Sequence, residues 1–174
     1  MFTDPVKNLK FLGLEENMIV ADLGAGTGYY AIPAAQIVKK GKVYAIEVQK
    51  DFLKTIINKS HESKLENLEC IWGDVEKIGG TKIGDSIVDA VVISNVFCFV
   101  EDKEGFLKEA KRILKIRGKL LLVELEEGSA IVAKSQNICI SQNKIRSLLE
   151  KEGFVHDRDI DTGDHHYGMI FRKE

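Results

Sequence analysis

A glycine-rich segment near the N-terminus restricts the fold of this chain more than any other feature of its sequence. An apolar run over residues 19–22 ends in Asp22 and is followed by three glycines at alternate positions, Gly24, Gly26 and Gly28. Because glycine has no Cβ, such a segment can turn tightly and its backbone can approach a ligand closely. The run before it predicts a short buried strand, and residues 29–39 after it predict a helix. A strand, a glycine turn and a helix in this order indicate an α/β fold.

The alternation of strand and helix continues toward the C-terminus. Further strands are expected at 42–47, 68–72, 89–94 and 119–124, and further helices at 51–64, after Asp102 and at 141–152. The last residues favour a β-hairpin, with strands at 154–159 and 167–171 joined by the turn 161–164. Strands that alternate with helices and end in a hairpin predict a mostly parallel sheet with one antiparallel strand.

Length and composition indicate one globular domain. We expect a single domain over residues 1–174, with an N-terminal helix and lead-in over 1–17 and the hairpin over 154–174. Hydrophobic residues make up 44% of the chain, which is enough for a buried core, and a formal net charge of -2 provides no general attraction to nucleic acid. No membrane span or signal peptide is expected, and the three cysteines favour free thiols, so we expect a cytoplasmic protein.

The glycine spacing and Asp22 together select the kind of ligand. The pattern is G-x-G-x-G, whereas nicotinamide and flavin dinucleotides are bound by G-x-G-x-x-G, whose third glycine would fall at Tyr29. A carboxylate at Asp22 would repel a pyrophosphate and attract a cation. S-adenosylmethionine carries a sulfonium and an ammonium group and no phosphate. The segment is therefore predicted to bind this cationic nucleoside, and an NAD-dependent oxidoreductase is the less favoured alternative.

Two more acids lie at the ends of predicted strands. Glu47 ends the second strand, where a carboxylate can accept hydrogen bonds from both ribose hydroxyls. Asp74 follows the third strand, where a carboxylate can accept a hydrogen bond from an adenine amino group while Val75 packs on the ring. Ligands of open α/β sheets bind at the carboxyl ends of the strands, so these acids and Asp22 are expected to surround one nucleoside.

These residues and the segments that follow them resemble the class I S-adenosylmethionine-dependent methyltransferases. The matching segments are VADLGAGTG, the acid of AIEV, the Asp of GDV, DAVVISNVF and FLKEAKRILKIRGKLLLVE, and they span nearly the whole chain. The resemblance implies a Rossmann-like, seven-stranded α/β sheet, mostly parallel with the last strand antiparallel and with helices on both faces. The pattern is most similar to small-molecule methyltransferases near the ubiquinone/menaquinone-biosynthesis group, although Ile116-Arg117-Gly118 stands where relatives often have Pro-Gly-Gly.

The resemblance also implies which residues bind the cofactor. The residues implied for the methionine part are Asp22, Gly24, Ala25, Gly26, Thr27 and Gly28. The residues implied for the rest are Glu47 and Val48 at the ribose, Asp74 and Val75 at the adenine, and Ser94 and Asn95 beneath the sulfonium. The expected cofactor is S-adenosylmethionine, with S-adenosylhomocysteine as its product.

The expected reaction is methyl transfer to a small-molecule acceptor by in-line displacement, in which alignment of the reactants supplies much of the acceleration. A base is required only if the acceptor must first lose a proton, and His165 and His166 are the candidates. Candidates for the floor of an acceptor pocket are Tyr29, Tyr30, Phe97 and Phe99. The acidic run 156–166 lacks the glycine and glutamate spacing of a calcium loop, so no metal is expected there.

The same sequence features are compatible with other functions. A non-catalytic module or regulatory subunit that binds S-adenosylmethionine or S-adenosylhomocysteine would share the cofactor residues and differ in the acceptor pocket. Cys98 lies in a segment similar to one in arsenite methyltransferases, which use cysteines as metalloid ligands, but Cys70, Cys98 and Cys139 show no spacing that would bring them together. Nucleic acid is not indicated as a partner. The acceptor surface is expected from the N-terminal helix, residues 124–140 and the hairpin, and a homodimer could close such a short cover.

Overall fold

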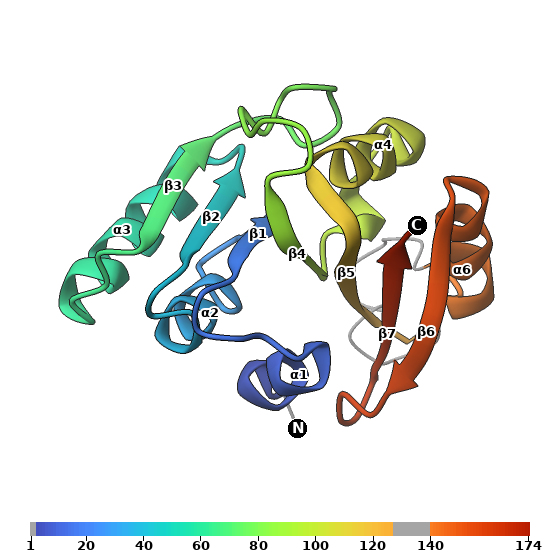
Figure 1. The fold of residues 1–174 in the computed structure, drawn as a ribbon, viewed down its shortest axis with the longest axis horizontal. Coiled ribbons are helices and arrows are strands. Elements are labelled where there is room, and N and C mark those ends of the chain that lie inside the picture. The colour runs from blue at the N-terminus through green and yellow to red at the C-terminus, as the bar shows by residue number, and fades with distance from the viewer. Residues whose placement is uncertain (1–2, 127–139) are drawn as a thin grey trace.

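The computed structural model describes residues 3–126 and 140–174, which form one seven-stranded sheet with helices on both faces (Figure 1). The strand order is β3-β2-β1-β4-β5-β7-β6. The strands are β1 Ile19–Leu23, β2 Lys42–Glu47, β3 Leu68–Trp72, β4 Val88–Ser94, β5 Leu114–Leu125, β6 Phe154–Ile160 and β7 His166–Lys173. Among them β7 alone runs against its neighbours, since it pairs antiparallel with both β5 and β6. The predicted fold class is therefore confirmed.

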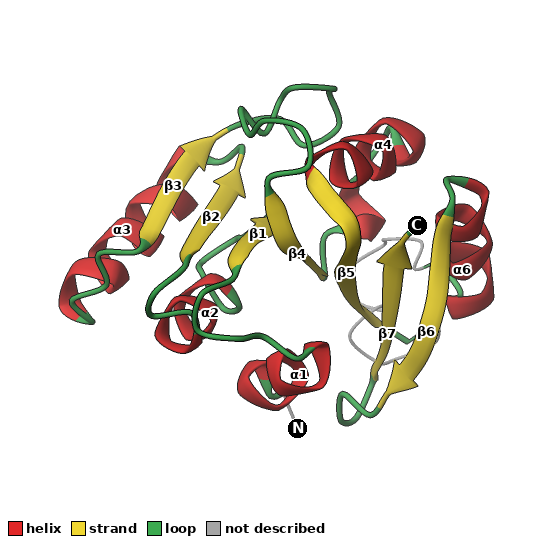
Figure 2. Ribbon diagram, in the orientation of Figure 1, coloured by secondary structure: helices red, strands yellow, loops and turns green. Residues whose placement is uncertain are grey.

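Two layers of helices cover the sheet (Figure 2). The helices are α1 Pro5–Leu12, α2 Ala31–Ile37, α3 Lys50–Glu62, α4 Lys103–Ile113 and α6 Gln142–Lys151, with a 3₁₀ turn η1 at Phe97–Phe99. Buried hydrophobic residues of α1 and α2, with Ile56 of α3, belong to one hydrophobic cluster, and those of α4 and α6 belong to the other. None of the described helices is long and apolar enough to cross a membrane.

The central strand β4 is buried on both faces, and only Asp89 and Ser94 in it stay partly exposed. Val91 and Ile93 point into the cluster under α4, while Ala90 and Val92 point into the cluster under α2. Period-two alternation of this kind divides the core into two layers. Because β1 and β4 are paired in parallel at the middle of the sheet, their carboxyl ends lie side by side.

The fifth strand begins earlier than the sequence predicted. Leu114 already pairs with Val88, and the next pair along is Lys119 with Ala90, so residues 115–118 form an irregular bulge. Arg117 in this bulge has a left-handed φ of 64°. The segment that departs from the Pro-Gly-Gly of relatives therefore lies at the start of β5, at the opposite end of the strand from Glu124.

The expected N-terminal helix is present, and its sequence explains where it begins and ends. The Asp4 side chain accepts a hydrogen bond from the backbone N–H of Lys7 at 3.1 Å, which caps the helix, and Pro5 follows at the first helical position. Gly13 ends the helix with φ 78°. Asn8 in α1 and Thr3 just before it are both buried against Tyr30, the residue that precedes α2.

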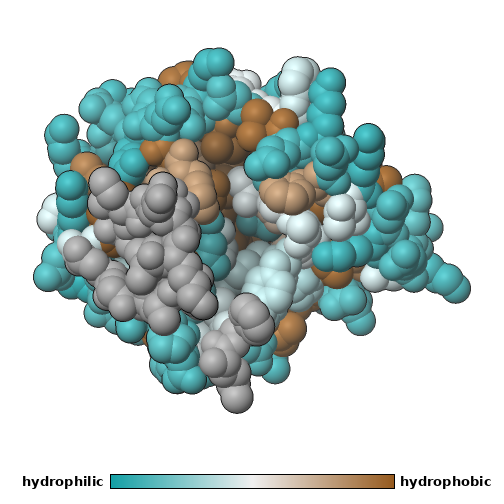
Figure 3. All heavy atoms as spheres, turned by 180° about the vertical axis from the view of Figure 1, so that it is seen from behind, coloured by the Kyte–Doolittle hydropathy of each residue, from teal (hydrophilic) through white to brown (hydrophobic). Residues whose placement is uncertain are grey.

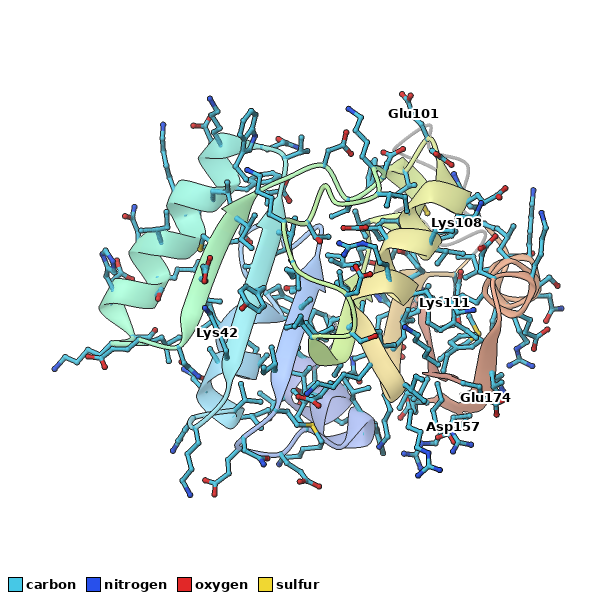
Figure 4. All side chains as sticks on the ribbon, turned by 45° about the horizontal axis from the view of Figure 1, so that its top comes forward. Lys42, Glu101, Lys108, Lys111, Asp157 and Glu174 are labelled. Carbon is cyan, nitrogen blue, oxygen red and sulfur yellow. The ribbon has the colours of Figure 1, made fainter. Side chains whose placement is uncertain are left out.

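Polar contacts tie the outer helices together. Lys111 on α4 donates from Nζ to the backbone oxygen of Glu152, at 2.7 Å, and so joins α4 to the end of α6 (Figure 4). On the face seen in Figure 3, hydrophilic residues cover most of the rim, and hydrophobic residues gather in patches nearer the middle.

Two glycine substitutions separate backbone strain from packing. Gly28 has φ +84°, and a Cβ there would lie 3.2 Å from Ile32 and 3.3 Å from Ile56. Gly163 has φ +93° and nothing within 4 Å of the same position. We expect Gly163→Ala to lower the free energy of unfolding by about 1–2 kcal/mol, the cost of a left-handed alanine. Gly28→Ala should cost about 1–3 kcal/mol more, from overpacking. Urea unfolding of both variants measures this difference, and equal losses would show that α2 and α3 can move apart freely.

Candidate active site

Two cavities meet at the carboxyl ends of β1 and β4. The first has a volume of about 400 Å³ and the second about 530 Å³. Gly24, Gly26 and Asn95 line both of them. The cavities therefore adjoin along the glycine turn and the end of β4, at the crevice where open α/β sheets bind their ligands.

Asp22 lies at the floor of the second cavity with an unsatisfied oxygen. Asp22 is 3% exposed, and its Oδ2 has no hydrogen-bond partner among the residues that the structure describes. Burial raises the pKa of Asp22 to about 7, and the nearby negative charge of Glu47 also raises it. A hydrogen bond from the Ala31 backbone lowers the pKa but does not cancel the effect of burial. A buried carboxyl with a spare acceptor in a cavity is suited to a cationic hydrogen-bond donor.

Glu47 ends β2 beside the same turn. Its Oε2 accepts from the backbone N–H of Gly26 at 2.9 Å, and its Oε1 accepts from the backbone N–H of Gln49 at 2.8 Å. These two bonds fix the carboxylate against the wall of the first cavity. Each carboxylate oxygen has a further lone pair, so a pair of neighbouring hydroxyls can still be bound there.

Asp74 and an apolar set of side chains form the far end of the first cavity. Asp74 accepts from the backbone N–H of Glu76 at 3.1 Å and pairs with Lys77 at 2.9 Å, which holds the pKa of its carboxyl below its usual range. The apolar and aromatic side chains that line this cavity are Ile46, Val48, Phe52, Val75, Val96, Phe99 and Val100. A flat aromatic base fits such a lining, with a carboxylate available at its edge.

The three glycines of the turn have different tasks. At Gly24, with φ 73°, a Cβ would meet Val96 Cγ2 at 2.4 Å, so the turn packs directly on the segment after β4. At Gly26, with φ 53°, a Cβ would meet nothing within 4 Å, so the backbone there faces open space. Gly28 lines neither cavity of the described structure and packs instead against α2 and α3.

A buried group of hydroxyls closes the back of the second cavity. The Tyr30 hydroxyl accepts from Asn8 Nδ2 at 2.8 Å and lies 3.1 Å from Thr3 Oγ1, and it also bonds with Ser94. Burial raises the pKa of Tyr30, so its hydroxyl stays protonated. Thr3, Tyr30 and Ser94 all line the cavity.

The two adjacent histidines lie in different surroundings. His166 begins β7, is 8% exposed and lines the second cavity, with Nε2 3.5 Å from Asn95 Nδ2. His165 is exposed, has φ 67° and lines neither cavity of the described residues. Asn95 also has a left-handed φ, 51°, a conformation that asparagine tolerates better than most residues.

A buried glutamate at the end of β5 holds the segment after β4. Glu124 Oε1 accepts from the backbone N–H groups of Val96 at 3.0 Å and Phe97 at 2.8 Å, and its Oε2 is 3.6 Å from Cys98 Sγ. Burial raises the pKa of Glu124 to about 7, although both backbone bonds oppose it. Glu124 therefore positions Asn95 and Val96 without lining the cavities itself.

The structure brings together most of the residues that the sequence singled out. Those that line one or both cavities are Asp22, Gly24, Ala25, Gly26, Thr27, Glu47, Val48, Asp74, Val75, Ser94 and Asn95. Tyr29 and Tyr30 line the second cavity and Phe99 the first, but Phe97 is buried in the core. Cys139 and most of the expected acceptor segment 124–140 lie outside the described residues.

Sequence reasoning missed Thr3, Asn8 and the positioning role of Glu124. Glu124 ends the apolar run KLLLVE as Glu47 ends KVYAIE, so the pattern of strand-end acids could have found it. No comparable signal exists for Thr3 and Asn8, whose partner Tyr30 is more than twenty positions away in the chain.

A seven-stranded sheet of this topology, with acids at the ends of β1 and β2 around a glycine turn, defines a nucleoside-binding α/β protein. Residues 21–122 match the family described as "Methyltransferase domain", which is more than half of the chain. The chain belongs to this methyltransferase family. Its resemblance to S-adenosylmethionine-dependent methyltransferases is thereby confirmed.

Individual relatives agree with this assignment. The crystal structure of a SAM-dependent methyltransferase from Aquifex aeolicus superposes with a TM-score of 0.85 and 28% sequence identity, covering 98% of this chain and 89% of that one. Arsenite methyltransferase of Mus musculus is 33% identical over 112 residues, covering 60% of this chain and 30% of the relative. The ubiquinone/menaquinone biosynthesis C-methyltransferase of Haemophilus ducreyi is 29% identical over 120 residues, covering 66% of this chain and 44% of the relative. The chain thus spans less than half the length of these two curated relatives.

The buried carboxyls predict an unusual dependence of stability on pH. Folding raises the pKa of the Asp22 carboxyl from 3.8 to about 7. The contribution of this carboxyl to the free energy of unfolding is therefore fully present below pH 4, and it is lost as the pH rises through 7. Each pKa unit corresponds to about 1.4 kcal/mol of stability, and we expect Asp22→Asn to remove the loss because asparagine does not ionise. In urea unfolding of the unliganded protein, the free energy of unfolding of the variant relative to the wild type should be higher at pH 8 than at pH 5. An unchanged difference between the two pH values would contradict the burial of an ionisable Asp22.

Proposed function

We propose that this protein is an S-adenosylmethionine-dependent methyltransferase that acts on a small-molecule acceptor. The observation that carries the proposal is the buried Asp22 carboxyl, whose Oδ2 is unpartnered among the described residues and faces the second cavity. The ammonium group of the cofactor would supply the missing hydrogen bond and a compensating charge.

The rest of the donor set also fits this cofactor. Glu47 would accept from the two ribose hydroxyls, and Asp74 and Val75 would hold the adenine in the apolar part of the first cavity. Gly26, with open space beyond its Cα, allows the amino-acid part of the cofactor close to the backbone. No lysine or arginine lines either cavity in the described part of the chain. Four acidic residues do, which are Asp22, Glu47, Asp74 and Glu76, and they disfavour a pyrophosphate-bearing dinucleotide.

The cofactor, when bound, supplies an electrophilic methyl group on a sulfonium. The protein's own part is alignment: the turn and the segment after β4 hold the cofactor at the junction of the cavities, next to space for an acceptor. Membership of the family and the Aquifex aeolicus neighbour support methyl transfer as the outcome. The single-domain extent over 1–174, a cytoplasmic location and a homodimer stay predictions from the sequence.

Calorimetry tests the proposal directly. We expect the wild type to bind S-adenosylmethionine and S-adenosylhomocysteine. Asp22→Asn should weaken the affinity for S-adenosylmethionine about 10–100-fold at pH 8, because a charge-assisted hydrogen bond is lost. Wild-type affinity should also increase as pH rises through 7, because Asp22 must ionise, whereas the variant should show no such increase.

The control variant is Asp51→Asn, which removes an acid from the exposed surface of α3 and should leave affinity unchanged. Failure of the folded wild type to bind either nucleoside would overturn the proposal. Binding without methylation of any acceptor in a broad panel would favour the alternative of a non-catalytic binding module.

A further inference from the structure

The second cavity contains more than the cofactor requires. Beyond the glycine turn and Asp22, uncharged hydrogen-bonding side chains from four separate parts of the chain line it. These side chains belong to Thr3, Tyr29, Tyr30, Ser94, Asn95 and His166. Among these, the imidazole of His166 has a ring nitrogen that can accept a proton from a ligand. The cavity is therefore equipped for a polar molecule beside the methyl group.

The hydrogen bonds of His166 determine which ring nitrogen is the acceptor. Nδ1 lies 3.2 Å from the backbone oxygen of Asp164, and because a carbonyl only accepts, Nδ1 carries the proton in the neutral ring. The lone pair is then on Nε2. Its nearest partner is Asn95 Nδ2 at 3.5 Å, a distance at which a hydrogen bond is weak. Nε2 can therefore accept from a molecule in the cavity at little cost.

The position of this ring is fixed by the sheet. His166 is paired with Leu125 in the β5–β7 ladder, and its backbone oxygen accepts from Thr162 Oγ1 at 3.0 Å. Asn95, its neighbour, lines both cavities and donates its backbone N–H to Val123 at 2.9 Å. A molecule bonded to Nε2 would therefore lie near the junction of the cavities, where the proposed function places the reactive methyl group.

The charges around the cavity restrict the acceptor. No lysine or arginine of the described residues lines the cavity, so a bound anion would have no cationic side chain to pair with. Neither Cys70 nor Cys98, the two cysteines that the structure describes, lines it either. A neutral acceptor that gives up its proton within the site fits these surroundings, whereas a carboxylate or phosphate does not.

One wall of the cavity suits a flat ring. Tyr29 is 47% exposed, its hydroxyl donates to the backbone oxygen of Thr3, and its ring meets Tyr30 edge-on with centroids 5.7 Å apart. Held from both ends in this way, the Tyr29 ring presents a fixed aromatic surface at the cavity.

We propose that His166 is the general base of the reaction and that the second cavity takes a small, uncharged aromatic or enolic hydroxyl compound. The inference rests on the proposed function. The proton of the hydroxyl passes to His166 Nε2, and the oxygen forms a bond to the methyl carbon. The carbon–sulfur bond breaks with its electron pair left on sulfur, so the sulfonium becomes a neutral thioether and the imidazole becomes a cation.

Nuclear magnetic resonance of the full chain, labelled with ¹⁵N and ¹³C in histidine and saturated with S-adenosylhomocysteine, tests this assignment with phenol as the probe. His166→Asn and His165→Asn identify the two sets of ring signals. We expect the ¹⁵N shifts of His166 to show the proton on Nδ1, and we expect phenol to shift the Nε2 signal of His166 and leave His165 unaffected. Anisole, which has the same ring and no hydroxyl proton, should shift it much less.

His166→Asn should weaken phenol binding at least tenfold and leave the affinity for S-adenosylhomocysteine within about twofold, while His165→Asn should change neither. His166→Gln repeats the test if the asparagine variant does not fold. A proton on Nε2, or equal responses to phenol and anisole, or phenol binding that survives both His166 substitutions, would overturn the inference while nucleoside binding stands. Failure to bind S-adenosylhomocysteine at all would instead overturn the proposed function.

Discussion

Burial of the Asp22 carboxyl near the end of the inner strand β1 is the constraint on which the rest of the site depends. Moving a carboxylate out of water is costly unless it is hydrogen-bonded or paired. Asp22 receives one backbone bond from Ala31, keeps one oxygen without a described partner, and lies near the charge of Glu47. The protein tolerates this because the raised pKa leaves the carboxyl largely protonated below neutral pH. A bound cation offsets the cost of the buried carboxylate, whereas a neutral or anionic ligand does not. The burial of Asp22 therefore favours a positively charged nucleoside.

The surrounding fold keeps this arrangement rigid. Gly24 packs on Val96, and Glu124 accepts the backbone N–H groups of Val96 and Phe97, so the turn after β1 and the segment after β4 are held against each other. Antiparallel addition of β7 beside β5 then brings His166 next to Asn95. Catalysis by alignment needs this stiffness, because small displacements of the reacting atoms lower the rate strongly.

The cofactor half of the site could be predicted from the sequence, and the acceptor half largely could not. Asp22, Glu47 and Asp74 each follow a strand that is visible as a local apolar run, and the sheet topology brings strand ends together regardless of detail. The cluster of Thr3, Asn8 and Tyr30, and the approach of His166 to Asn95, depend on side chains 22 to 71 positions apart. Gly28 belongs to the glycine pattern and yet serves packing, because a periodic motif does not reveal which of its members faces the ligand.

A crystal structure of the complex with S-adenosylhomocysteine would show most directly whether Asp22 binds the amino group of the nucleoside. We expect the amino group of the ligand about 3 Å from Asp22 Oδ2, the ribose hydroxyls on Glu47, and the sulfur atom beside Asn95 where the two cavities meet. A nucleoside bound elsewhere, or one that leaves Asp22 without a partner, would contradict this expectation.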